Sequence, residues 1–164
     1  MERLERFAVG ALQPETDVAA MLWAFVGYWK GSGRQVQIFH GQSRFADDDC
    51  VQTICGESAR YLDSWLMSPD LCRERLSLGA KGSDVVLVEG PMANERRRGG
   101  SLDDLCQWLD LPLLTVVDVA SLDRCAVPPK PKGAAALLLD RVADSDAHRV
   151  AANLESIWGI PVLG

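Results

Sequence analysis

The sequence has only two histidines, His40 and His148, and none of its five cysteines belongs to a C-x-x-C pair. Zinc sites usually combine histidine and cysteine ligands at short, fixed spacings, so the sequence does not predict one. Cys50 and Cys55 follow the acidic run 47–49, but this spacing fits no common metal site. We therefore expect the cysteines to be reduced and mainly structural.

The chain also lacks an excess of positive charge and any long apolar segment. Its 17 Lys and Arg stand against 23 Asp and Glu, and the formal net charge of -6 argues against a nucleic-acid surface, which is usually basic. No apolar stretch reaches the roughly 18 residues that a membrane helix needs. The charged N-terminal segment does not look like a signal peptide. We therefore expect a cytoplasmic protein that binds neither nucleic acid nor membrane.

Short apolar runs alternate with segments of helical periodicity over residues 1–164, which we expect to form a single domain. The expected strands cover residues 7–12, 35–40, 84–89, 112–118, 135–139 and 160–163, and the expected helices cover residues 19–29, 57–67, 69–79, 102–109 and 145–158. Thr16 or Asp17 is expected to cap the first helix, and Ser68 and Ser101 two later ones. This alternation predicts a three-layer α/β/α fold with a mostly parallel sheet of about six strands.

The strongest local signal is the apolar run 85–88, which ends in Glu89 and Gly90. A continuous run of this kind is typical of a strand buried on both faces of a parallel sheet. Ligands of such sheets bind just beyond the carboxyl ends of the strands. Glu89 therefore lies where a ligand for a metal or a phosphate would be useful.

A basic cluster, Arg96-Arg97-Arg98, follows this strand. Three neighbouring arginines can bind an anionic small molecule, and the start of the helix that Ser101 caps would lie close enough to help. The alternative is an exposed charge run without a ligand, which is the interpretation that we favour.

Several short segments follow one another in the order of the motifs of one enzyme family. They are 61–69 (N-L-D-x-W-M-x-S-P in the family), 84–92 (a strand ending in E-G-x-M), 100–101 (G-S-T-A-E-L-A), 112–118 (P-V-V-L-V-V-D), 141–148 (N-R-V-x-S-x-x-H) and 159–164 (G-I-P-V-L-G). Together they resemble the ATP-utilising domain of cobyrinic acid a,c-diamide synthases, which is akin to dethiobiotin synthetase. The resemblance implies a P-loop topology, ATP and Mg²⁺ as cofactors, Glu89 as a candidate Mg²⁺ ligand and Asp63 in a substrate-side segment. Mg²⁺ is usually held together with substrate phosphates, so we favour a solvated, idle Glu89. In the same segment we expect Trp65 to pack in the core.

The chain departs from this family at the phosphate loop. Family members carry a glycine-rich loop that ends in G-K-T-T, whereas residues 9–18 contain a single glycine, Gly10, and no lysine precedes Lys30. Glu15 or Asp17 would place negative charge beside a triphosphate, and a charge pair at about 4 Å is worth roughly 4 kcal/mol at an effective dielectric of 20. We therefore expect ordinary ATP binding to be lost.

Three further departures concern the adenine site, the connection after Asp118 and the amide donor. Asp140 replaces the family asparagine that reads adenine, and an ionised aspartate can only accept hydrogen bonds. The connection that follows Asp118 is short and rich in proline. The sequence ends at the last matching strand, so we expect the glutaminase half of the synthases, with its nucleophilic cysteine, to be absent.

Three functions stay open. The leading hypothesis is a degenerate family member without ATP-dependent ligase activity, which needs no cofactor, forms a homo-oligomer and acts as a binding or assembly module. The first alternative is an ATP- and Mg²⁺-dependent amide-forming ligase of cobalamin biosynthesis, in which residues 96–98 replace the missing lysine. The second is a binder of another anionic small molecule. No catalytic residue is assigned, and the candidate ligand-binding residues are Asp63, Arg96, Arg97, Arg98, Ser101 and Asp140.

Overall fold

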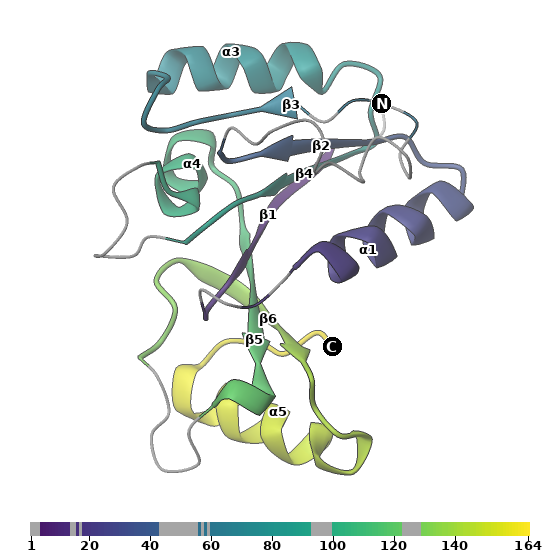
Figure 1. The fold of residues 1–164 in the computed structure, drawn as a ribbon, viewed down its shortest axis with the longest axis vertical. Helices are drawn as coiled ribbons and strands as arrows, with labels where there is room; N and C mark the ends of the chain where they lie inside the picture. Colours follow the sequence, from purple (N-terminus) through teal and green to yellow (C-terminus); the bar gives the residue numbers. More distant parts are fainter. Residues whose placement is uncertain are drawn as a thin grey trace.

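The computed structural model describes residues 4–13, 16, 18–42, 56, 58, 60–92, 100–122 and 129–164. The strands of this part of the chain are β1 (Glu5–Ala11), β2 (Val36–His40), β3 (Arg60–Tyr61), β4 (Val85–Glu89), β5 (Leu113–Asp118) and β6 (Ala134–Asp140). Its helices are α1 (Ala19–Gly31), α3 (Pro69–Gly79), α4 (Leu102–Leu109), the 3-10 helix η2 (Val119–Ser121) and α5 (Asp144–Trp158) (Figure 1).

All six strands belong to one sheet, with the order β3-β2-β4-β1-β5-β6, and every pairing is parallel. The strand that opens the sequence, β1, therefore lies in the middle, between β4 and β5. Because all strands run in the same direction, their carboxyl ends meet at a single edge of the sheet. The predicted parallel α/β/α fold is confirmed.

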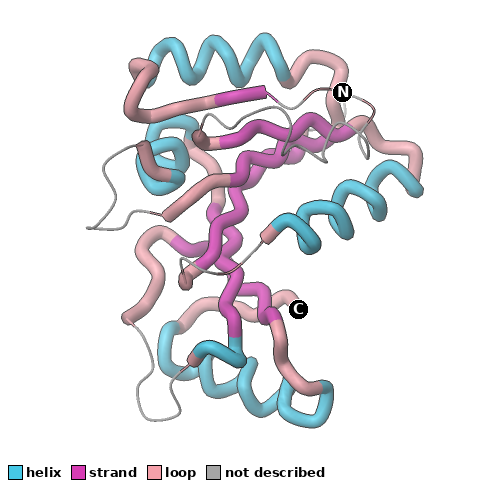
Figure 2. Tube along the Cα trace, in the orientation of Figure 1, coloured by secondary structure: helices cyan, strands magenta, loops and turns pink. Residues whose placement is uncertain are grey.

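Alternating residues of the central strands face different helices. Val86 and Val88 pack with Cys72 of α3 and Leu105 of α4. Their neighbours in β4, Val85 and Leu87, pack instead with Leu22 and Val26 of α1. Since side chains alternate between the faces of a strand, α1 covers one face of the sheet and α3 and α4 cover the other. Figure 2 shows the strands running between these helices.

The third part of the core lies against β5 and β6. Leu154 and Trp158 of α5 pack there with Val117, Leu137 and Ile160. The helix predicted at 145–158 is therefore confirmed, and it buries Leu154 and Trp158 against the sheet. Among the described residues, no helix is both long enough and apolar enough to cross a membrane.

One predicted element is wrong and another is formed only in part. Within the described part of the predicted helix 57–67, residues 60–61 form β3, which pairs with β2, and a tight turn comes after it. The predicted strand at 160–163 is formed in part: it makes a parallel bridge between Val162 and Leu137 of β6, and the N–H of Leu163 donates to the carbonyl oxygen of Leu137 at 2.9 Å. Backbone pairing with β2, a partner distant in the sequence, overrides the helical pattern of the first segment.

The predicted helix caps are confirmed at two of three positions. Ser68 accepts a hydrogen bond from the backbone N–H of Leu71, and Ser101 accepts one from Asp104. The N-cap position of α1 is Val18, which makes no side-chain cap bond, so the predicted cap at residue 16 or 17 is wrong.

Candidate functional site at the carboxyl edge of the sheet

Four polar side chains end four strands of the sheet at the same edge: His40 on β2, Glu89 on β4, Asp118 on β5 and Asp140 on β6. His40, Glu89 and Asp118 are almost completely buried, with exposed fractions of 3%, 2% and 1%. Buried charged groups require partners, because desolvation of an unpaired charge is costly. The partners of these side chains therefore indicate what the edge can do.

Glu89 is paired with a histidine that the sequence did not point to. The register of β2 and β4 places His40 directly beside Glu89, and the Nδ1 atom of His40 hydrogen bonds to Oε1 of Glu89. The ring of Tyr61 lies against His40, with 5.5 Å between the ring centroids. Glu89 is thus a buried, paired carboxylate, and the solvated carboxylate that we favoured is wrong.

The backbones just after His40 and Glu89 approach each other closely. The N–H of Gly41 donates to the carbonyl oxygen of Glu89 at 2.6 Å. A Cβ atom on Gly90 would lie 3.2 Å from the Cα atom of Gly41. Gly41 and Gly90 therefore allow the backbones that follow β2 and β4 to pass close to each other beside the buried pair of His40 and Glu89.

Asp118 is neutralised by an arginine from the end of β6. The Nε atom of Arg141 donates to Oδ1 of Asp118 at 2.9 Å, and the backbone N–H of Ser121 donates to the same oxygen at 3.3 Å. Arg141 adopts a left-handed conformation with φ of 52°. This conformation, uncommon for a residue with a side chain, is part of the turn from which Arg141 reaches back to β5.

The start of the loop after β1 is tied to β5 through Gln13. Its Nε2 atom donates to the carbonyl oxygen of Asp118 at 2.9 Å, and the N–H of Asp118 donates to Oε1 of Gln13 at 3.0 Å. Residues 14, 15 and 17 of the predicted degenerate phosphate loop lie outside the described residues, so the candidate charges Glu15 and Asp17 are not placed.

Asp63 and Ser101 lie in neighbouring segments, as a common site would require. Oδ1 of Asp63 accepts hydrogen bonds from the backbone N–H groups of Trp65 (2.9 Å) and Leu66 (3.2 Å). The N–H of Ser101 donates to Oγ of Ser64 at 2.8 Å, and Oγ of Ser101 donates to Asp104. These bonds hold a turn against the start of α4, which is a structural role for Asp63, Ser64 and Ser101.

The turn presents two apolar side chains to solvent. Trp65 and Leu66 have exposed fractions of 72% and 67%. The prediction that Trp65 packs in the core is wrong, because Leu62 fills the buried position of this segment and is completely buried.

The remaining predicted site residues fall into two groups. Asp140 is half-buried beside Asp118, its register partner in β5. The candidates Arg96, Arg97 and Arg98 lie outside the described residues, as do Cys50 and Cys55. In the described ranges, no three His, Cys, Asp or Glu side chains form a group that could hold a metal ion.

Comparison with curated proteins identifies one group of relatives. The chain is 27% identical over 129 residues to the cobyrinate a,c-diamide synthase of Priestia megaterium, covering 76% of this chain and 27% of that protein. It is 32% identical over 127 residues to the hydrogenobyrinate a,c-diamide synthase of Agrobacterium fabrum, covering 66% of this chain and 28% of that protein. The chain thus spans less than a third of the length of these two relatives. No protein-family model matches it.

Comparison with solved structures supports the same fold. The MinC:MinD cell division protein complex of Aquifex aeolicus matches with a TM-score of 0.55 and 11% identity, over 96% of this chain and 80% of that one. A ParA family ATPase of Chlorobium tepidum matches with a TM-score of 0.55 and 14% identity, over 98% and 83%. At such low identity these likenesses concern the fold alone, which is that of P-loop ATPases.

Proposed function

We propose that this chain, which is similar to cobyrinate a,c-diamide synthases and has a P-loop ATPase fold, is a member of that family that has lost ATP-driven ligation and acts as a binding or assembly module. The observation that carries this proposal is the buried pair of Glu89 and His40. A carboxylate that would hold Mg²⁺ in an active relative is here already bound by a side chain of the same domain.

Binding of Mg²⁺ at Glu89 would have to compete with this internal partner. Leaving a buried polar group without its hydrogen-bond partner typically costs about 1–3 kcal/mol, and more for a charged group. Mg²⁺ rarely offsets such a cost through one carboxylate, because it is usually held by one or two carboxylates together with substrate phosphates. The residues at this position therefore do not fit the magnesium ion that the family implies.

The charges at the carboxyl edge do not fit a triphosphate either. Glu89, Asp118 and Asp140 contribute three carboxylates, and Arg141 is committed to Asp118. No lysine precedes Lys30 in the sequence, so the cation that would grip the phosphates is missing from the segment after β1. Gln13 engages the end of β5 instead.

The binding role rests on the turn that Asp63 organises. Exposed aromatic side chains on rigid backbone are typical anchors of protein interfaces. Trp65 and Leu66 are presented in this way, because hydrogen bonds to Asp63 fix their backbone N–H groups. We expect this turn to take part in a homo-oligomer contact.

Nucleotide titration tests the loss of ligation. The full chain is titrated with ATP·Mg²⁺ and ADP·Mg²⁺ by calorimetry and thermal shift, alongside Glu89→Gln and the matched exposed variant Glu74→Gln. A site with a dissociation constant of about 10 μM would, at about 1 mM nucleotide, stabilise the fold by roughly 2.7 kcal/mol. We expect no stabilisation. Micromolar binding that Glu89→Gln weakens and Glu74→Gln does not would overturn this proposal and favour the ATP-dependent ligase.

Two further measurements separate the remaining functions. Light scattering during size-exclusion chromatography should detect an oligomer at a protein concentration of about 100 μM. Trp65→Ala should weaken the contact, so that more of the protein is monomeric at the same concentration. A monomer at that concentration would contradict the assembly role. Stabilisation by phosphate or sulfate, lost when Arg96, Arg97 and Arg98 are replaced, would favour a binder of small anions.

A further inference from the structure

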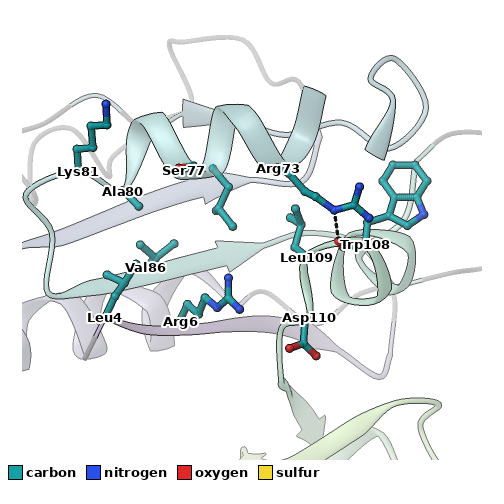
Figure 3. A pocket seen from close by; sticks show the side chains of 11 residues that line it. Leu4, Arg6, Arg73, Ser77, Ala80, Lys81, Val86, Trp108, Leu109 and Asp110 are labelled. Carbon is teal, nitrogen blue, oxygen red and sulfur yellow. Dashed lines mark hydrogen bonds between the residues drawn. The ribbon is translucent and has the colours of Figure 1, made fainter. Parts of the chain in front are cut away.

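A hollow of about 580 Å³ lies at the opposite edge of the sheet, where the strands begin (Figure 3). It is enclosed by the first residues of β1 and β4 and by the C-terminal ends of α3 and α4. Its volume is within the range of about 300–1,000 Å³ that is typical of small-molecule sites. The hollow is separate from the Glu89 edge, so a ligand can bind in it whether or not the proposed function holds.

The floor of this hollow is apolar. Val86 of β4 is completely buried, and Leu76 of α3 and Leu109 of α4 are nearly so. Both helices end close to this point, α3 at Gly79 and α4 at Leu109, so the amino edge of the sheet face that they cover is left open. An apolar group that entered the hollow would remove from water both its own apolar surface and that of the floor.

Arg6 places a cation on this apolar floor. It is the register partner of Val86 on the neighbouring strand, and alternation along β1 puts it on the same face as buried Ala8. The side chain is exposed, and among the described residues it makes no hydrogen bond or ion pair. Its guanidinium can therefore offer two parallel N–H groups to a planar anion.

A second arginine lines the same hollow in a fixed position. The Nε atom of Arg73 on α3 donates to the carbonyl oxygen of Trp108 at 3.1 Å, and its Nη1 atom donates to Asp70 at 2.7 Å. The first bond joins α3 to the end of α4 (Figure 3), and the second lies within α3. Lys81 and Asp110 also line the hollow and add one positive and one negative charge. Because Arg73 is paired with Asp70, the charge that is left over in the lining is the single positive charge of Arg6. A ligand with a single negative charge suits this balance better than a dianion.

We propose that this hollow binds a small monocarboxylate with a compact apolar body. The carboxylate pairs with Arg6, and the apolar body lies against Leu76, Val86 and Leu109. Small-molecule sites usually combine an apolar lining with a small number of precisely placed polar groups. The carboxylate determines the orientation of the ligand, and the floor supplies most of the buried apolar area.

The probe for this site is octanoate. Its binding to the full chain is measured by calorimetry at concentrations below those at which octanoate forms micelles. We expect Arg6→Gln to weaken binding about tenfold, through loss of the charge-assisted hydrogen bonds. The matched variant Arg75→Gln, an exposed arginine of α3 outside the hollow, should leave binding unchanged. Octanamide, which has the same body without the charge, and acetate, which has the charge without the body, should both bind more weakly.

Ser77→Trp provides an independent test of the location. Ser77 is an exposed residue of α3 that lines the hollow, so an indole at this position should fill the space without disturbing the core. We expect this variant to abolish octanoate binding even if Arg6→Gln proves difficult to fold. No octanoate binding to the parent protein, or binding that survives Ser77→Trp unchanged, would overturn the proposal.

Discussion

The carboxamide of Gln13 forms with the backbone of Asp118 the two hydrogen bonds that a neighbouring strand would form. One runs from Nε2 to the carbonyl oxygen (2.9 Å) and the other from the Asp118 N–H to Oε1 (3.0 Å). This contact joins the segment after β1 to the end of β5, and the same Asp118 also binds Arg141 through its carboxylate. The first residues of the loop after β1 are thereby connected to Asp118 and Arg141 at the carboxyl edge of the sheet.

Replacing Gln13 by alanine should lower the free energy of unfolding by about 1–3 kcal/mol, because it leaves a backbone donor and a backbone acceptor of buried Asp118 without partners. Urea unfolding monitored by tryptophan fluorescence measures this change. The control is Gln107→Ala, at an exposed position of α4, which should shift stability by less than about 0.5 kcal/mol. Equal effects of the two substitutions would show that the Gln13 bonds contribute nothing.

The parallel sheet could be predicted from the sequence because each central strand is a continuous apolar run that ends at a polar residue. The run 85–88 is buried on both faces, as that pattern requires. The caps at Ser68 and Ser101 are equally local, since each serine bonds to a backbone N–H three residues ahead.

The errors concern elements that depend on distant partners. Residues 60–61 become a strand because β2 offers them backbone partners, which the local helical pattern does not reveal. The same reason explains why the partner of Glu89 was missed. His40 is 49 positions away, and it becomes a neighbour only because β2 and β4 lie side by side in the sheet order.

The contact between the 63–66 turn and α4 should not tolerate a side chain at Gly100. A Cβ atom there would lie 2.6 Å from Oγ of Ser64 and 2.9 Å from the backbone nitrogen of Trp65. Backbone cannot move aside as a flexible side chain can, so we expect Gly100→Ala to cost about 1–3 kcal/mol of stability.

Gly27→Ala is the matched control for that substitution, because a Cβ atom at Gly27 of α1 meets no other atom within 4 Å. Alanine favours a helix interior over glycine, so this control should raise stability by about 0.5–1 kcal/mol. Thermal unfolding compares the two variants, and an unchanged melting temperature for Gly100→Ala would refute the close packing of this turn.

Leu62 and Trp65, three residues apart, should respond in opposite ways to truncation. Leu62 is completely buried, and Leu62→Ala should destabilise the fold by about 2–5 kcal/mol through lost burial and a cavity. Trp65 is 72% exposed, so Trp65→Ala in the dissociated chain should change stability by less than about 0.5 kcal/mol. Urea unfolding at low protein concentration tests both. A large loss at Trp65 would mean that the indole packs within the domain.

The thiol of Cys106, on α4, should react slowly and should make stability depend on alkaline pH. Burial, together with the nearby charge of Asp103, raises the pKa of Cys106 from its ordinary value of 9.0 to about 12. At pH 8 roughly one thiol in ten thousand is then ionised, against about one in ten in the unfolded chain, and only the thiolate reacts. Mass-spectrometric mapping should therefore show alkylation of Cys106 by iodoacetamide about a thousandfold slower in the native protein than in urea.

The same pKa difference sets the sign of the pH effect on folding. The folded state keeps the Cys106 proton to higher pH than the unfolded state, so the contribution to stability is complete below about pH 9 and is lost as the pH rises toward 12. Cys106→Ala removes this titration while leaving the other alkaline groups in place. Between pH 8 and pH 10.5, urea unfolding should therefore show a larger loss of stability for the parent protein than for Cys106→Ala. Parallel losses, or native alkylation as fast as in urea, would mean that solvent reaches the thiol.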